Sequence, residues 1–213
     1  YSSAASDVYK RQPDGTRILY GITLPIEQAG NPPVPHRLFS VLVSTGVSTQ
    51  VPLGTMQACD PFWGPGGEIY FWTFDELWRA HTDGSGIRKL GHFRNHVSSS
   101  KSADGRYLFY ARRTNPYELH RLDLNTGLDQ LIADQLYSAS FSISARNLYF
   151  VDSKMSLMST PLEGGPTIKI ASLPVQRILQ DIVGLSVSAD DSAIAYSLSD
   201  LRQLDLMLVR NFR

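Results

Sequence analysis

Short runs of apolar and aromatic residues, each about four to seven residues long, are separated along the chain by turns rich in Gly, Asp and Ser. Runs such as 16–20 (TRILY) and 106–110 (RYLFY) place branched and aromatic side chains directly after a turn, as half-buried strands do. Sustained helical periodicity is absent from the sequence, and only residues 174–183 (PVQRILQDIV) predict a helical turn. The pattern therefore predicts an all-β fold.

The turn and the strand after it recur along the chain. Residues 13–20 (PDGTRILY) return as 103–110 (ADGRYLFY) and more weakly as 189–196 (ADDSAIAY), with degenerate copies at 64–71 and 144–150. Asp14 and Asp190 lie 176 residues apart, which over four intervals gives a mean spacing of 44. A second apolar run follows each copy, at 37–41, 76–80, 118–122, 156–160 and 204–208. This spacing lies in the range of about 40 to 50 residues that is typical of β-propeller blades.

Each repeat is predicted to form a four-stranded antiparallel sheet, because Asp-Gly pairs supply the positive φ that tight hairpins need. A β-sandwich also contains many short strands, but it has no reason to repeat the same strand-turn-strand text at a fixed interval. We therefore expect an all-β propeller in the form of a partial ring of about five blades. Their predicted bounds are about 13–53, 56–91, 95–133, 136–172 and 181–213.

Both ends of the chain depart from the repeat. Residues 1–12 show no periodicity, so we expect a non-native or disordered leader outside the fold. The first blade is expected to lack its innermost strand, and the last blade its outermost strand. A bare blade face exposes several large apolar side chains at about 1.5 to 3 kcal/mol each, so we predict that this polypeptide alone is marginally stable or prone to aggregate.

Composition and charge narrow the function classes. With 42% hydrophobic residues the chain can bury a sizeable core. Lys plus Arg and Asp plus Glu each number 20, so the basic surface that nucleic-acid binding requires is missing and we expect no nucleic-acid partner. Apolar runs stay well short of the roughly 20 residues of a membrane-spanning helix, so we expect no membrane contact by this segment. The single cysteine, Cys59, excludes an internal disulfide and a multi-cysteine zinc site.

Residues 102–112 (SADGRYLFYAR) and 76–79 (ELWR) carry the repeat most clearly, and they resemble the WD-like repeat of TolB-type β-propellers. The final stretch, 184–191 (GLSVSADD) and 205–212 (DLMLVRNF), is similar to the last blade of C-terminal propellers of bacterial winged-helix transcriptional regulators and of some serine/threonine kinases. The resemblance implies a sensory or scaffolding propeller on the periplasmic or cytoplasmic side of a membrane-attached regulator. Blade four departs from the motif, because 144–146 (SAR) replaces its Asp-Gly turn.

We expect the binding residues at one rim, where the links between blades and the connections between second and third strands meet. Loops held by a rigid scaffold carry a large share of binding residues. The links between blades supply the candidates Asp60, His92, Arg94, His96, Asp134, Arg177 and Asp181. Mixed acidic and basic side chains suit a protein partner or a small polar ligand, although solvated loops in any protein are polar too.

His92 and His96 have an H-x3-H spacing, which on a helix directs two imidazoles at one zinc ion. Because this segment is predicted to be a loop without a third ligand, we expect no metal site and no cofactor. The other histidines, His36, His81 and His120, are expected at the surface, and Cys59 in the core. The aromatic block 70–74, with Trp78, is expected to fill the space between blades rather than to form a stacking platform.

The sequence lacks a G-x-S-x-G elbow and a Gly-rich phosphate loop, so we predict no catalytic residue. The expected function is a non-catalytic interaction or sensor module from the C-terminal part of a larger bacterial regulatory protein. One alternative is a fragment of an enzymatic propeller, either a metal-dependent polysaccharide lyase or a peptidase-associated propeller. The other alternative is a structural spacer.

Overall fold

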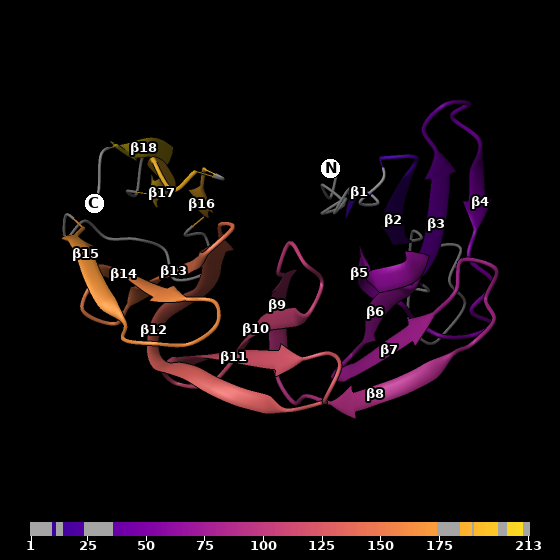
Figure 1. Cartoon of the computed structure of the whole chain (residues 1–213), viewed down its shortest axis with the longest axis horizontal. Helices are drawn as coiled ribbons and strands as arrows, with labels where there is room; N and C mark the ends of the chain where they lie inside the picture. Colours follow the sequence, from indigo (N-terminus) through magenta and orange to yellow (C-terminus); the bar gives the residue numbers. More distant parts are fainter. Residues whose placement is uncertain are drawn as a thin grey trace. The chain divides into compact units, whose positions relative to one another are not determined.

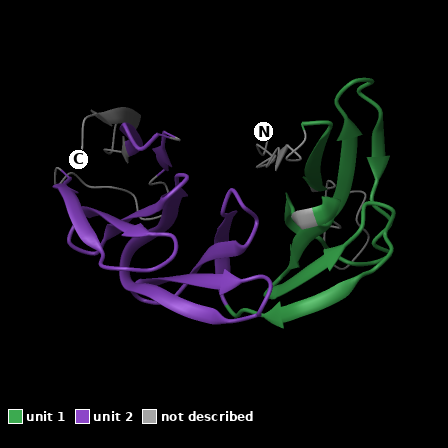
Figure 2. Cartoon of the chain, in the orientation of Figure 1, with its two compact units in different colours: residues 1–94 green, residues 95–213 purple. Residues whose placement is uncertain are grey.

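A computed structural model describes residues 10–11, 15–23, 36–173, 184–188, 190–199 and 204–210. These residues form antiparallel strands, turns and one short 3-10 helix, η1 (Pro65–Gly67), so the predicted all-β fold is confirmed. In the described ranges no helix has the length and hydropathy to span a membrane. The chain divides into two compact units, Tyr1–Arg94 and Asn95–Arg213 (Figure 2).

Unit 1 contains two antiparallel sheets, which are the first and second blades. The first sheet has the order β1 (Lys10–Arg11), β2 (Arg17–Thr23), β3 (His36–Leu42) and β4 (Ser48–Gln50). The second has the order β5 (Cys59–Trp63), β6 (Ile69–Thr73), β7 (Glu76–Ala80) and β8 (Arg88–His92). Each strand pairs with the strand next to it in the sequence, as a meander requires.

The start of the first sheet differs from the sequence prediction. Lys10 and Arg11, which fall in the expected leader, form β1 and pair with Leu19 and Ile18 of β2. The first sheet therefore has a short inner strand, where the sequence predicted none. A segment without hydrophobic periodicity still has backbone N–H and C=O groups, and these can pair with the edge of β2.

The two sheets of unit 1 share a hydrophobic core. Leu19 and Leu38 of the first sheet pack with Trp63, Ile69 and Phe71 of the second, and all five side chains are at most 2% exposed. All five residues of β6 are buried, so both faces of this strand are covered. The predicted role of Tyr70, Phe71 and Trp72 as blade core is thus confirmed.

Unit 2 contains a seven-stranded sheet with the order β15-β14-β13-β12-β11-β10-β9 and a three-stranded sheet with the order β16-β17-β18. The strand bounds are β9 (His96–Lys101), β10 (Tyr107–Arg112), β11 (Tyr117–Asp123), β12 (Asp129–Ile143), β13 (Asn147–Asp152), β14 (Ser156–Pro161), β15 (Ile168–Ser172), β16 (Leu185–Val187), β17 (Ala193–Ser199) and β18 (Leu204–Arg210). The seven-stranded sheet holds the third and fourth blades, and the three-stranded sheet is the fifth.

Strand β12 joins two blades without a break. Its 15 residues pair first with β11 and then with β13, and the register shifts between Leu136 and Phe141 (Figure 1). The sequence predicted two strands here with a link at 134–135. Because β12 is continuous, Asp134 lies within a strand and not in a loop.

Successive blades in unit 2 also share their cores. Phe109 and Leu119 of the third blade pack with Leu148 and Phe150 of the fourth. In the next core, Tyr149 and Leu157 of the fourth blade pack with Ile194 and Tyr196 of the fifth. Within each unit, neighbouring blades therefore cover one another's apolar faces and stabilise one another.

Each blade has two distinct ends. The connections from first to second strand and from third to fourth strand lie at one end, which we call the turn end; in the third blade these are residues 102–106 and 124–128. The connection from second to third strand and the links to neighbouring blades lie at the other end, which we call the crossover end. In the third blade, the connection from second to third strand is residues 113–116.

The repeated Ser-x-Asp-Gly text forms a self-contained turn at the turn end. The Ser102 hydroxyl donates to Asp104 Oδ1 at 2.6 Å and accepts the Tyr107 N–H at 2.9 Å, while Asp104 Oδ1 accepts the Arg106 N–H at 3.0 Å. The fifth blade repeats this network with Ser188 and Asp190. These contacts give the motif a structural role.

The turn of the fourth blade is two residues shorter. Ser144 Oγ accepts the N–H of Asn147, three residues on, whereas Ser102 Oγ accepts the N–H of Tyr107, five residues on. Ser144 Oγ also accepts a hydrogen bond from the Arg146 N–H at 3.1 Å. In the full-length turn, the corresponding N–H of Arg106 donates to Asp104 instead. In the shortened turn, Ser144 alone therefore accepts the backbone hydrogen bonds that Ser102 and Asp104 share in the third blade.

Candidate functional site

The two ends of the blades differ in how the backbone turns. Of the eleven described glycines with positive φ, ten lie in turn-end connections, and only Gly54 lies in a link between blades. Among the five described non-glycine residues with positive φ, four lie at crossover ends: Asp60, Phe74, Asn95 and Met155. Asn and Asp tolerate this conformation because their side chains hydrogen-bond locally, but Phe and Met do not. Strain of this kind clusters at functional sites, which directs attention to the crossover ends.

Phe74 is the clearest of these positions. It is the first residue of a two-residue turn between β6 and β7, and its φ is 54°. The hairpin turns that fit a two-residue loop need positive φ here and strongly prefer Gly, Asn or Asp. The Phe74 side chain is 76% exposed, so packing does not explain an aromatic residue at this position. The prediction that the whole aromatic block is core is therefore wrong for Phe74.

The register of the second blade places three predicted candidates at the same end as Phe74. Cys59, Trp72, Leu77 and Gly91 form one row of paired residues across β5 to β8. Asp60 is the second residue of β5, which begins at the crossover end, and His92 ends β8 and precedes the exposed Arg94. Asp60, His92 and Arg94 thus lie at the crossover end of one sheet, beside the turn that carries Phe74.

Neighbouring contacts fix this end of the second blade. The Phe93 N–H donates to the Asp75 carbonyl at 2.6 Å, which ties the link after β8 to the Phe74 turn. The Phe93 ring meets Trp72 edge-on at 5.8 Å. A hydrogen bond from Lys89 is the main cause that lowers the pKa of Glu76, so Glu76 stays ionised at neutral pH. An exposed aromatic ring here has charged residues of both signs around it.

The other predicted candidates lie in unit 2 or outside the described residues. His96 begins β9 and pairs with Arg112 of β10. Asp134 lies in β12 next to Ala133, which pairs with Leu119 of β11. Arg177 and Asp181 are outside the described residues. The binding role of all these candidates stays a prediction.

The histidines do not form a metal centre in the part of the chain that the structure describes, where no group of three or more His, Cys, Asp or Glu side chains could hold a metal ion. His92 is exposed at the end of β8, and His96 is half-buried at the start of β9. Both are in strands, although the sequence predicted one loop from 91 to 96. His81 is exposed, as expected.

The predicted surface position of His120 is wrong. This residue is 7% exposed, and its ring stacks on Tyr110 at 5.1 Å between centroids. Nε2 lies 3.2 Å from Glu118 Oε2, and Nδ1 lies 3.4 Å from Asp129 Oδ1. The Tyr110 hydroxyl also donates to Asp129, at 2.7 Å. One carboxylate from the same strand, Glu118, and one from the adjacent strand, Asp129, therefore lie against this histidine, and the Asp129 contact depends on the register of β11 with β12.

This network favours a protonated histidine. Burial lowers the pKa of His120, but its interactions with the Asp129 and Glu118 carboxylates outweigh burial and raise the pKa above its ordinary value of 6.5. Burial likewise opposes ionisation of Asp129, yet its interactions with His120 and its hydrogen bond from Tyr110 leave the Asp129 pKa lowered. The same burial and the same bond to Asp129 raise the pKa of Tyr110. Tyr110 and Asp129 are hydrogen-bonded, whereas His120 Nδ1 is buried without a hydrogen bond and lies 3.4 Å from Asp129 Oδ1. The raised pKa of His120 and the lowered pKa of Asp129 favour the ion pair, and we interpret this buried cluster as structural.

Cys59 has the properties of a packing residue. Its thiol donates to the Trp72 carbonyl at 3.5 Å. Burial, with the neighbouring Asp60 charge, raises the pKa of the Cys59 thiol to about 11. A thiol with so high a pKa is a poor nucleophile at neutral pH.

The sequence matches no protein-family model and no curated protein. Its structure resembles that of an oligogalacturonate lyase in complex with manganese, with a TM-score of 0.72 and 15% identity over 95% of this chain and 64% of that chain. The oligogalacturonate lyase of Vibrio parahaemolyticus gives a TM-score of 0.71 and 12% identity over 96% of this chain and 65% of that one. A putative TolB from Agrobacterium tumefaciens gives 0.63 and 13% over 96% and 76%.

These similarities establish the class of fold. The chain is a TolB-like β-propeller with antiparallel four-stranded blades, as the repeat predicts. It spans less than two thirds of the length of either lyase. Because identities of 12 to 15% show the fold alone, the function has to be argued from the residues of this chain.

Proposed function

We propose that this propeller is a non-catalytic interaction module that binds an exposed segment of a partner protein at the crossover end of its second blade. The observation that carries the proposal is Phe74, an aromatic residue that is 76% exposed in a backbone conformation that favours glycine. Asp60, His92 and Arg94 lie at the same end and supply polar groups for contacts beside it.

Physical chemistry supports this use of Phe74. Aromatic and Arg side chains dominate the energy of protein interfaces, where a central anchor is surrounded by polar contacts. An exposed ring gains free energy when a partner covers it, and a rigid two-residue turn loses little entropy in the process. The strain at Phe74 is retained at a cost to stability, which a purely structural turn would avoid by using glycine.

The proposal extends to the context of the module. The resemblance of residues 184–191 and 205–212 to the last blade of regulator propellers supports a sensory role as part of a larger bacterial regulatory protein. His96, Asp134, Arg177 and Asp181 are retained as candidates that contribute to a partner-binding surface. A small polar ligand at these residues is the second form of the same proposal.

The test uses the full chain and a library of random peptides displayed on phage. Peptides selected against the wild-type protein are expected to lose binding to Phe74→Ser and to Arg94→Ala variants. The matched control is Val47→Ser, because Val47 is also apolar and 60% exposed, but lies at the turn end of unit 1. Equal binding of the selected peptides to the Phe74→Ser variant would show that the anchor is elsewhere.

The structural similarity to oligogalacturonate lyases supports one alternative, a metal-dependent lyase. Its test is incubation of the full chain with manganese and oligogalacturonate, followed by the ultraviolet absorbance of the unsaturated product. Turnover that depends on His92 or His96 would replace the interaction proposal. Binding of phage peptides without turnover would favour the interaction module.

A further inference from the structure

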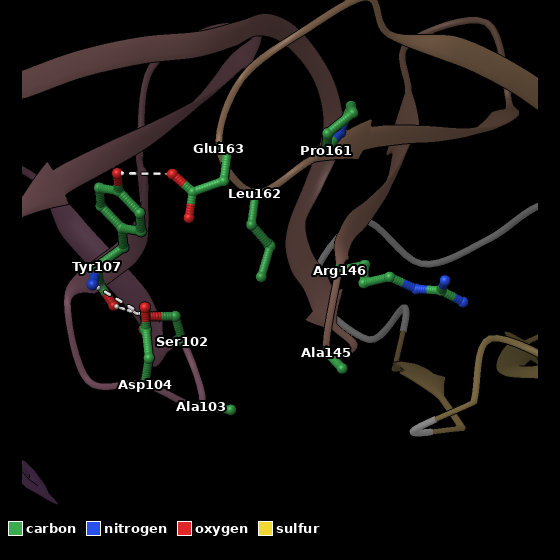
Figure 3. A pocket seen from close by; sticks show the side chains of 9 residues that line it. All are labelled: Ser102, Ala103, Asp104, Tyr107, Ala145, Arg146, Pro161, Leu162 and Glu163. Carbon is green, nitrogen blue, oxygen red and sulfur yellow. Dashed lines mark hydrogen bonds between the residues drawn. The ribbon is translucent and has the colours of Figure 1, made fainter.

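A pocket of about 360 Å³ lies between the third and fourth blades in unit 2, at their turn ends (Figure 3). Its lining comes from the turn before β10, the turn before β13 and the start of the turn after β14. This volume is at the lower end of the range of about 300 to 1,000 Å³ for small-molecule sites. None of the candidates predicted from the sequence lines it.

One wall of the pocket is a fixed aromatic side chain. The guanidinium carbons of Arg106 and Arg121 lie 4.6 and 4.7 Å from the centroid of the Tyr107 ring. Arg106 is also paired with Asp123 at 3.1 Å, and Arg121 donates to the Leu162 carbonyl. These contacts order Tyr107, and two cations already use its π-face, so the ring offers little to a third.

Two carboxylates in the pocket keep unused acceptor atoms. The Tyr107 hydroxyl donates to Oε2 of Glu163 at 3.1 Å, and Arg106 Nη1 lies 3.7 Å from the same oxygen. Asp104 accepts both of its hydrogen bonds at Oδ1, and the bond from Ser102 is the main cause that lowers its pKa. In the described structure, Glu163 Oε1 and Asp104 Oδ2 have no hydrogen-bond partner. Both carboxylates therefore can accept a bond from a ligand.

The one basic residue of the lining is engaged elsewhere. Arg146 Nε lies 3.8 Å from Asp191 Oδ2 of the fifth blade. Figure 3 shows its guanidinium directed away from Tyr107 and Glu163. Among the lining residues, two carboxylates, Asp104 and Glu163, therefore face the pocket against one guanidinium that is directed away. Arg106, outside the lining, offsets part of this negative charge because it contacts Glu163.

The rest of the lining is apolar. Ala103, Ala145, Pro161 and Leu162 contribute to the walls, and Figure 3 shows the Leu162 side chain pointing into the space between Tyr107 and Ala145. Ala145 belongs to the shortened turn of the fourth blade. Short alkyl chains fit such walls, whereas a strongly hydrated inorganic cation gains nothing from them.

From this lining we infer that the pocket between the third and fourth blades binds an alkylammonium group, held by Glu163 and Asp104 with its alkyl chain against Leu162 and the alanines. This site is separate from the proposed partner surface around Phe74, because it is at the turn end of other blades. The shared ligand chemistry is that of a free alkylamine or of a lysine side chain on a partner.

The test is calorimetric titration of the full chain with two cations and their neutral counterparts. The free ligand pair is n-pentylamine and pentanol, and the peptide pair is acetyl-Gly-Lys-Gly-amide and the same peptide with norleucine. We expect saturable binding of the cations, weakened by salt, and no binding of the neutral molecules. Preference for the peptide over pentylamine identifies a partner lysine as the source, and the reverse identifies a free amine.

Variants assign the binding to this pocket. Glu163→Gln keeps the acceptor for Tyr107 but removes the charge, and it is expected to weaken the cation about two- to fivefold, the range for an exposed ion pair. Adding Asp104→Asn should bring the loss to about tenfold if the two carboxylates act independently. Asp190→Asn is the matched control, because Asp190 has the same role in the turn of the fifth blade and does not line the pocket.

Three results would overturn the inference: equal binding of pentanol and pentylamine, unchanged affinity in the double variant, or an equal loss in the Asp190→Asn control. Absence of any saturable cation binding would do so as well. Each variant is checked for an unchanged melting temperature, so that a loss of binding is not a loss of fold.

Discussion

Phe74 allows a direct test of whether strain is stored at the crossover end of the second blade. The perturbation is Phe74→Gly, which keeps the two-residue turn between β6 and β7 and removes the side chain that disfavours positive φ. The backbone of the native turn has a φ of 54° at this position, which glycine adopts without steric cost.

The expected magnitude follows from three contributions. Relief of the left-handed conformation gains about 1–2 kcal/mol, and the greater freedom of glycine in the unfolded chain costs about 0.5–1 kcal/mol. The side chain is 76% exposed, so only about a quarter of a burial energy of about 1.5–3 kcal/mol is lost, or about 0.5 kcal/mol. We therefore expect a net change between a loss of about 0.5 and a gain of about 1 kcal/mol.

The comparison that isolates strain uses Val47→Gly in the same unit. Val47 is 60% exposed and is not among the positive-φ residues, so its replacement loses burial and chain entropy with no compensating relief. By urea denaturation, the free energy of unfolding of Phe74→Gly should exceed that of Val47→Gly by about 1–2 kcal/mol. Equal losses in the two variants would mean that Phe74 is not strained, and the argument for its selection would fail.

Two further predictions concern unit 2. Because the pKa of His120 is raised above 6.5 in the folded protein, its charge stabilises the fold below that pH, and this contribution is lost as pH rises through the higher folded pKa. The unfolding free energy should therefore fall as pH rises above 6.5, and it should fall less in a His120→Gln variant. The same pH dependence in both proteins would contradict this. Inserting Asp-Gly between Ala145 and Arg146 gives the fourth blade the same turn sequence as residues 102–106, so the unfolding free energy should change by less than about 1 kcal/mol. The control is the same insertion between Tyr149 and Phe150, which should break the pairing of β13 and leave the chain unfolded in a thermal melt.

The fold was predictable because local text and tertiary packing agree. Ser102 and Asp104 form the same turn as Ser188 and Asp190, although Asp191 stands in the fifth blade where the third has Gly105. Within each unit, the apolar runs after these turns pack against the neighbouring blade, so the repeat determines both the strand and its neighbour. The continuity of β12 was not predictable, because two adjacent polar residues, Asp134 and Gln135, are as typical of a loop as of an exposed strand.

Two site features depended on pairing that the sequence does not display. His120 is buried because the register of β11 with β12 brings Asp129 to it, and a lone histidine in a strand gives no sign of that carboxylate. Phe74 could have been recognised, since the runs 69–73 and 76–80 leave only Phe74 and Asp75 for a turn. In the sequence, Phe74 comes directly after the buried run 70–73, so the aromatic block hides the turn.

Both proposed binding places include an irregular turn, one at a turn end and one at a crossover end, and there is a physical reason for this. A full Ser-x-Asp-Gly turn consumes its serine hydroxyl and one carboxylate oxygen in its own hydrogen bonds, so it has few groups left for a ligand. Where the fourth blade lacks Asp-Gly, Ala145 forms a wall of a pocket in which the neighbouring Asp104 keeps its second oxygen. Where the second blade carries Phe74 in place of a turn-forming residue, a ring is held out at the crossover end. Because the repeated residues stabilise the fold, a side chain at an irregular position is not needed for stability and can bind a ligand or a partner.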